Sequence, residues 1–201
     1  MFGEVRELQT MRMRVKAQAS QHEDAVIEAD AEAIRALAAA LQRARNERHA
    51  QCGPFDSDGR NLEIKIVVDD SRIFSHRWRR AKLPYTDPEA ASWRTGPDSL
   101  APEEHARMVL ASEGTSAHVT ACNLLDLLHT VTWQIFYYGP ILNLHEPSRD
   151  DGTAWIVTNG PGCQDLVRAL ERVLESGSFK LSLIASDDEG FDLRVRCLDS
   201  P

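Results

Sequence analysis

The first quarter of the chain has the polar and apolar pattern of long amphipathic helices. No glycine or proline occurs between residues 4 and 51, and the strong helix formers Ala, Leu, Glu, Gln and Arg dominate this segment. Ser20 and Glu23 have the spacing of a capping box, in which each side chain bonds to the backbone of the other residue. We therefore predict two helices, over about 3–18 and 21–49, or one kinked helix.

Apolar residues recur with a spacing of seven in the second of these helices. Ile27, Ile34 and Leu41 form this repeat, and Leu37 and Ala44 follow its second and third members by three residues. The pattern is typical of a coiled-coil seam of about three heptads. Two alternatives stay open, because the stripe can pair with a second copy to form a homodimer or pack on the rest of the chain.

The remainder of the chain predicts a mixed α/β body. Residues 51–61 are rich in turn formers, and we take them as a linker between a helical segment, 1–50, and an α+β domain, 62–201. Pro102 and two glutamates begin a short helix that ends near Ser112. Alternation and periodicity then place strands over 62–68, 154–158, 179–185 and 191–198, and covering helices over 115–138 and 164–176. The predicted fold is α+β, with long N-terminal helices followed by a mostly antiparallel four-stranded sheet and two covering helices.

The net charge of −8 lies in the second half of the chain. Residues 1–50 carry eight basic and eight acidic side chains, and residues 61–95 carry seven and five. Residues 96–201 carry seven basic and sixteen acidic side chains. An acidic half repels nucleic acid and membrane phosphates and attracts a basic protein surface, although ordinary solubility also accounts for it.

One basic segment stands out in this acidic chain. Between Arg72 and Lys82 there is no acidic residue, and the basic residues surround a tryptophan. Such a segment can grip a phosphate backbone and stack a base, or it can pair with the protein's own acidic half or with another protein. The residues that we predict to contact a partner are Arg77, Trp78, Arg79 and Arg80.

A polar stripe on the predicted helix 115–138 contains transition-metal ligands. His118, Cys122, Asp126 and His129 fall on one side of this helix. His118 and His129 lie about 16 Å apart along the axis, so one metal ion cannot bind both. A site would need further ligands from His76, His105 or His145. The alternative is a polar helix face with no metal.

Cys163 invites a catalytic interpretation because it follows a Gly-Pro-Gly turn at the start of a helix. A helix N-terminus lowers the pKa of a thiol, and His145 or His129 could serve as its base. No local signature of a known cysteine enzyme surrounds it, and such a turn is also common as plain geometry.

The four cysteines are far apart, which argues against a disulfide framework and a zinc knuckle. The N-terminal residues lack the pattern of a secretory signal, and polar residues interrupt the longest apolar stretch. We therefore expect a cytoplasmic protein that does not enter a membrane.

The sequence favours a cytoplasmic protein–protein interaction module, such as an adaptor, an inhibitor or an immunity-type accessory protein. We expect no catalytic activity of its own and no cofactor or metal. The partner would be another protein, with a basic surface as the charge suggests, and nucleic acid is not expected. Two alternatives remain: an enzyme that uses the His118/Cys122/Asp126/His129 face or Cys163, and a nucleic-acid-linked protein that uses the Arg72–Lys82 segment.

Overall fold

The computed structural model describes residues 11–71, 76–92, 98–112 and 139–199. Eight strands and five helices fall within these ranges. In chain order they are β1 (Met13–Lys16), β2 (Ala25–Ala29), α1 (Ala31–Glu47), β3 (His49–Ser57), β4 (Arg60–Val68), α2 (His76–Arg80), α3 (Pro88–Ser92), α4 (Pro102–Ser112), β5 (Leu142–His145), β6 (Thr153–Thr158), α6 (Gly160–Ser176), β7 (Ser178–Ile184) and β8 (Gly190–Cys197).

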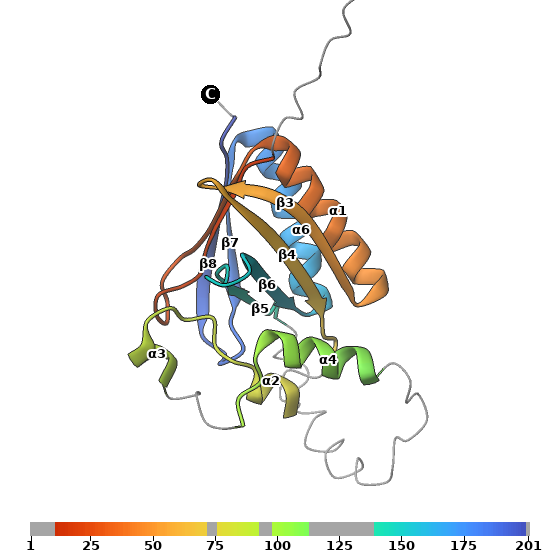
Figure 1. Cartoon of the computed structure of the whole chain (residues 1–201), viewed down its shortest axis with the longest axis vertical. Coiled ribbons are helices and arrows are strands. Elements are labelled where there is room, and N and C mark those ends of the chain that lie inside the picture. The colour runs from red at the N-terminus through yellow and green to blue at the C-terminus, as the bar shows by residue number, and fades with distance from the viewer. Residues whose placement is uncertain (1–10, 72–75, 93–97, 113–138, 200–201) are drawn as a thin grey trace, which may run out of the picture.

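The strands form two mixed sheets of four strands each (Figure 1). One sheet has the order β1-β2-β8-β7 and the other the order β3-β4-β6-β5. In each sheet the central pair is parallel and both outer pairs are antiparallel. Each sheet therefore takes one hairpin from the first half of the chain and one hairpin from the second half.

The two halves of the chain repeat one ββαββ unit. β1 spans residues 13–16, and β5 occupies the corresponding place in the second half at 142–145. The same sequence offset relates α1, residues 31–47, to α6, residues 160–176, and both helices have 17 residues. It also relates the ends of β4 and β8, at Val68 and Cys197. An approximate two-fold relation therefore exchanges the two sheets and the two helices.

The ends of the two long helices obey the same relation. Asp30 precedes α1, and its side chain accepts a hydrogen bond from the backbone N–H of Ala33 at 2.8 Å. Asn159 precedes α6, and its side chain accepts from the N–H of Gly162 at 2.8 Å. Each cap satisfies a backbone donor that the helix itself leaves without a partner. Both helices end on a residue in the left-handed conformation, Arg48 and Gly177.

Each half also caps the helix of the other half. The carboxylate of Asp70, just after β4, accepts from the N–H of Gly160 in α6 at 2.7 Å. Asp199, just after β8, accepts from the N–H of Ala31 in α1 at 3.0 Å. Asp70 and Asp199 are themselves equivalent positions of the two halves. The halves are thus interlocked both by strand exchange and by these reciprocal caps.

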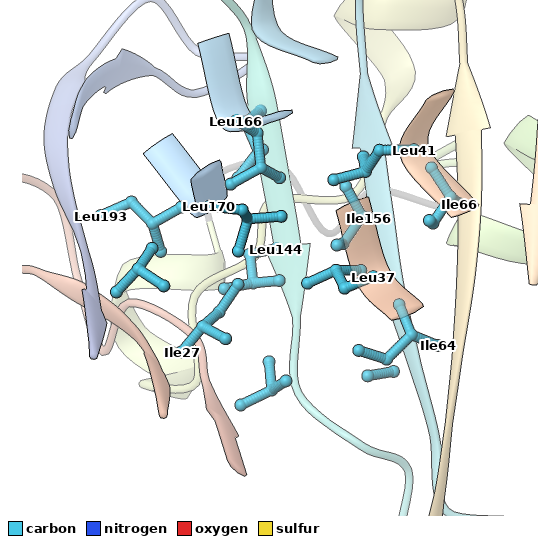
Figure 2. Packing of buried hydrophobic residues seen from close by; sticks show 14 of the residues in the cluster. Ile27, Leu37, Leu41, Ile64, Ile66, Leu144, Ile156, Leu166, Leu170 and Leu193 are labelled. Carbon is cyan, nitrogen blue, oxygen red and sulfur yellow. The ribbon is translucent and has the colours of Figure 1, made fainter. Parts of the chain in front are cut away.

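One apolar core joins both sheets and both long helices. Figure 2 shows side chains of α1, α6 and strands from both sheets meeting in it. Several equivalent positions hold the same residue, namely Ile27 and Ile156, Leu37 and Leu166, and Leu41 and Leu170. Burying one leucine of this kind stabilises the fold by about 2 kcal/mol. The symmetric part of the protein is therefore its stable scaffold.

The prediction of long N-terminal helices is wrong. Residues 13–16 and 25–29 are strands, and the first helix begins only at Ala31. Ser20 and Glu23 belong to the turn between these strands, where the N–H of Glu23 bonds to the backbone oxygen of Ser20 at 3.4 Å. Pairing of β2 with β8 supplies partners that local helix propensity does not take into account.

The predicted coiled-coil seam is also absent, because its residues belong to different elements. Ile27 lies in β2, whereas Ile34, Leu37 and Leu41 lie in α1. All four side chains are fully buried inside the chain's own core. The stripe of α1 is therefore occupied by α6 and the two sheets, so it offers no surface for a homodimer.

The four predicted strands are present near their expected bounds, but they do not form one sheet. β4 and β6 belong to one sheet, and β7 and β8 belong to the other. The segment taken as a linker, residues 51–61, lies largely in β3, which pairs antiparallel with β4. Its turn residues have local roles, since Asp58 and Gly59 turn the chain from β3 into β4 with positive φ angles.

A long insertion, residues 69–141, connects the two halves. Figure 1 shows α2, α3 and α4 gathered at the end of the molecule where β4 finishes. α4 packs on the outer face of the β3-β4-β6-β5 sheet, where Ala106 and Val109 contact Val67 and Trp155. The insertion therefore adds a layer to one sheet of the scaffold.

Candidate functional site

The insertion is fastened to the scaffold by a buried carboxylate, Asp69, directly after β4. Its side chain is 1% exposed. Arg77 of α2 donates from Nε to Oδ2 at 3.1 Å and from Nη2 to Oδ1 at 2.9 Å. His105 of α4 lies with Nε2 at 2.8 Å from Oδ2. We call Asp69, Arg77, Trp78 and His105 the Asp69 cluster.

The hydrogen bonds keep Asp69 ionised. Burial by itself would raise the pKa of this carboxyl group, but bonds from His105, Arg77 and Ser71 outweigh it and lower the pKa well below the ordinary value. A charge that is buried in this way is tolerated only when it is paired and fully hydrogen-bonded. Asp69 therefore binds α2 and α4 to the sheet through one charge.

The acceptor character of Asp69 assigns a proton to one ring nitrogen of His105. Since a carboxylate can only accept, the Nε2 atom that faces it carries a proton. The His105 side chain is 1% exposed, and among the described residues Nδ1 has no hydrogen-bond partner. The ring packs against Trp78 in an edge contact, with the centroids 5.1 Å apart.

Asp69 and His105 resemble the acid and base of a catalytic triad only in part. A triad also needs a nucleophile within hydrogen-bond reach of the free ring nitrogen. No hydroxyl or thiol of the described residues bonds to Nδ1 of His105. The cluster can therefore position the insertion, but the described side chains do not complete a reaction centre.

The structure places the predicted partner-contact residues in different environments. Arg77 bonds to Asp69, and Trp78 is fully buried. Arg80 donates from Nε to the backbone oxygen of Asp98 at 2.5 Å, and Arg79 is exposed. A buried indole cannot stack on a base, so the geometry of this segment does not favour nucleic acid.

The environment of Cys163 is the opposite of an activated thiol. The side chain is fully buried, and its Sγ donates to the backbone oxygen of Leu41 at 3.4 Å. Burial raises the pKa of the thiol to about 11, although Arg45 opposes this shift. His145 does not bond to it, and burial, with Lys82 and His105, lowers the pKa of His145 to about 3.

The proposed metal face, His118, Cys122, Asp126 and His129, lies outside the described residues, as does the predicted helix 115–138. Among the residues that are described, no group of three or more His, Cys, Asp or Glu side chains could hold a metal ion. His105 was a candidate ligand, and the structure pairs it with Asp69 instead.

Sequence analysis missed the Asp69 cluster, although part of its signal was present. Asp69 follows a buried strand directly, and an acidic residue at the carboxyl end of such a strand is suited to a site. His105 shares the buried side of α4 with Ala106 and Val109. What no local pattern revealed is that His105 and Arg77 both bond to Asp69.

The two edges of α4 that flank its buried side are partly exposed and apolar. Met108 lies on one edge and Leu110 on the other, and each is 36% exposed. Glu103, Glu104 and Arg107 are exposed on the same helix. Exposed leucine and methionine beside charged residues are typical of protein contact surfaces. A single exposed apolar residue is also common on surfaces that bind nothing.

No protein-family model matches this chain, and no curated protein or solved structure matches it. Within the described ranges, no helix is long and apolar enough to cross a membrane. The function must therefore be argued from the surfaces of the molecule.

Proposed function

We propose that this chain is a protein–protein interaction module without catalytic activity of its own, an accessory protein of the adaptor, inhibitor or immunity type. The observation that carries the proposal is the insertion at 69–141. It is anchored by the Asp69 cluster and presents the charged outer side of α4 with an exposed apolar residue on each edge.

The use of the polar side chains supports this role. The groups best suited to chemistry, Asp69, His105 and Cys163, bond to other parts of the fold and are almost fully buried. Binding residues are often carried on long connections that a rigid scaffold positions. The insertion fits that description, because it connects the two halves of a symmetric scaffold.

The contact surface that we propose comprises Met108 and Leu110, with the charged residues around them. Apolar side chains of this size supply binding energy when a partner buries them, and the charges set the orientation of the partner. Arg79 lies on the same insertion and remains a candidate contact. Arg77 and Trp78 would act indirectly, by holding the insertion in place.

The test is quantitative affinity purification of the full chain from its native cells. The double variant Met108→Glu/Leu110→Glu places a charge on each exposed edge of α4, and Leu198→Glu is the control on another surface. Leu198 is 42% exposed and follows β8, whose end lies away from α4 in Figure 1. We expect one protein to be enriched with the wild type and the control and to fall about ten-fold or more with the double variant.

Two outcomes would refute the proposal. One is that no protein is enriched reproducibly with the wild type. The other is that Leu198→Glu reduces enrichment as much as the α4 variant does, because the loss would then not depend on α4. Circular dichroism of each variant checks that its fold is retained.

A further inference from the structure

The two sheets are equivalent, but among the described residues only one has a helix over its outer face. In the β3-β4-β6-β5 sheet, α4 lies over Val67 and Trp155. The equivalent positions in the other sheet are Arg196 and Val26. Both belong to an open depression of about 550 Å³ on the outer face of β1, β2 and β8. No described helix packs there, so within the described residues the scaffold carries a helix on one outer face and none on the equivalent face.

Four cationic and three acidic side chains line this depression, and each of its three arginines pairs with one of the carboxylates. Arg14, Lys16, Arg194 and Arg196 project outward from β1 and β8. The strand register places Val26 directly opposite Lys16 on one side and Arg194 on the other. We call this lining the β2 groove; it comprises these four cations with Val26, Asp24, Glu28 and Asp58.

Two of the three acidic groups in the β2 groove lie deeper than the arginines that they pair with. Arg194 pairs with Asp24, and their side chains are 48% and 29% exposed. Arg196 pairs with Glu28 at 3.5 Å, and these side chains are 55% and 27% exposed. The third, Asp58, is 66% exposed and pairs with Arg14 at the rim. Asp24 and Glu28 therefore line the floor, while the guanidinium groups of Arg194 and Arg196 reach into solvent and keep donors for a further acceptor.

One cation in the groove, Lys16, lacks an ion-pair partner among the described residues. It is exposed, and no carboxylate of the described ranges lies within ion-pair distance of it. Across the strand it faces Val26, which is only half-buried. An apolar side chain between Lys16 and Arg194 suits a ligand that has both an apolar and an acidic side.

We propose that the β2 groove binds an acidic amphipathic helix of a partner protein. The helical form of the ligand follows from the scaffold, because α4 occupies the equivalent face of the other sheet. Its acidic side would pair with Lys16 and the arginine tips, and its apolar side would cover Val26. The net charge of −8 opposes approach at long range, but screening limits that effect beyond about 8 Å at physiological salt.

This inference builds on the proposed binding role and names the chemistry of one binding element. It uses a different surface from α4, so each can fail separately. A nucleic acid is the competing ligand for a cationic groove. The three carboxylates among the cations and the apolar Val26 between Lys16 and Arg194 favour a helix with mixed sides instead.

The test is an NMR titration of the isotope-labelled full chain with a defined probe. The probe is a blocked peptide of about 20 residues, with leucine along one side of the helix and glutamate along the other. A second peptide has lysine in place of each glutamate, and a single-stranded oligonucleotide is the third ligand. We expect saturable shifts of β1, β2 and β8 amides with the acidic peptide only.

Charge reversal at Lys16 gives the matched test. Lys16→Glu breaks no ion pair among the described residues, so it does not threaten the fold. It should weaken binding of the acidic peptide about five-fold or more, whereas Arg35→Glu, the same charge change on the exposed side of α1, should not.

The proposal is overturned if the acidic peptide causes no shifts in the β2 groove, if the basic peptide binds equally well, or if the oligonucleotide binds more tightly. It is also overturned if Arg35→Glu weakens binding as much as Lys16→Glu. Met108→Glu/Leu110→Glu should leave peptide binding unchanged. Retained peptide binding together with no loss of a cellular partner in that variant would therefore refute the α4 surface and not the groove.

Discussion

Replacing Asp69 by asparagine should release the insertion from the scaffold. The substitution keeps the shape of the side chain but removes the charge that Arg77 and His105 share. One carbonyl oxygen remains as an acceptor, while the new amide group brings its own donors to Arg77 or His105. In this variant the amide N–H groups would face the N–H donors of Arg77 or His105, in a site that water hardly reaches.

The magnitude follows from the burial of the three partners. Asp69 and His105 are each 1% exposed and Arg77 is 21% exposed. Removing one partner of a buried ion pair costs about 3–5 kcal/mol, and the oxygen that asparagine keeps favours the lower end. About 3 kcal/mol corresponds to a loss of roughly 100-fold in protection from opening.

The neighbouring residue supplies the matched control. Asp70 is 43% exposed, and it pairs with Arg48 at the surface. Asp70→Asn removes that pair but keeps the oxygen that accepts from Gly160. Since an exposed ion pair contributes about 0–1 kcal/mol, this variant should change protection less than about five-fold.

Native-state hydrogen exchange of the full chain measures both effects. Amides of α4 should lose about 100-fold in protection in Asp69→Asn, whereas amides in the centres of α1 and α6 should keep theirs. The reasoning is refuted if α4 protection is unchanged. It is equally refuted if Asp70→Asn loosens α4 as much, because the burial of Asp69 would then have no special effect.

The same carboxylate predicts an acid limit for docking of the insertion. The pKa of Asp69 is far below its ordinary value in the folded protein, so its stabilising effect is complete above the unfolded pKa of about 3.9. It should be lost progressively as the pH falls below that value. Near-UV circular dichroism should show this loss in the wild type, and Asp69→Asn should lack most of that acid dependence.

Three further predictions concern other residues. Because burial, Lys82 and His105 lower the pKa of His145 to about 3, the unfolded chain takes up a proton near pH 6.5 that the folded chain does not, and stability should fall as the pH drops from 6.5 toward 3. His145→Gln should flatten this part of the urea-denaturation profile, and an unchanged slope would contradict the assignment. Cys163, with its pKa raised to about 11, should resist iodoacetamide at pH 8 until urea unfolds the chain, and peptide mapping that finds fast labelling would restore the thiol-enzyme hypothesis. Asp30→Ala and Asn159→Ala should each lower the free energy of unfolding by about 1–2 kcal/mol and by similar amounts, and unequal effects would argue against equivalent caps.

Sequence patterns located well the elements in which the spacing of apolar and polar residues fits only one type of secondary structure. The alternation in β4 and the proline and acids at the start of α4 gave bounds close to those observed. The segment before Ala31 has two interpretations. Met13 and Val15 alternate with exposed residues as a strand requires, yet the absence of glycine and proline also suits a helix. Long-range pairing decided the outcome, since Ile27 lies beside Val195.

A signal for that pairing was present in the sequence as a likeness between the two halves. Ala25 and Ile27 match Ala154 and Ile156, and the second pair lies in a strand that alternation predicted. Comparing the halves would have assigned the first pair to a strand as well. The Asp69 cluster had no such signal, because Arg77, Trp78 and His105 come from an irregular insertion that the repeat does not include, and the position equivalent to Asp69 holds a leucine.

The symmetry also explains why loss of the Asp69 cluster should remain local. At the position equivalent to Asp69, the second half has Leu198, which is 42% exposed and forms no buried ion pair. The backbone makes the same hydrogen bond at both positions. The N–H of Asp69 donates to the backbone oxygen of Thr158, and the N–H of Leu198 donates to the backbone oxygen of Ala29, both at 2.8 Å. The second half thus completes the same strand pairing without a buried charge. The scaffold has no need of the Asp69 carboxylate, and this residue instead stabilises a feature that the halves do not share.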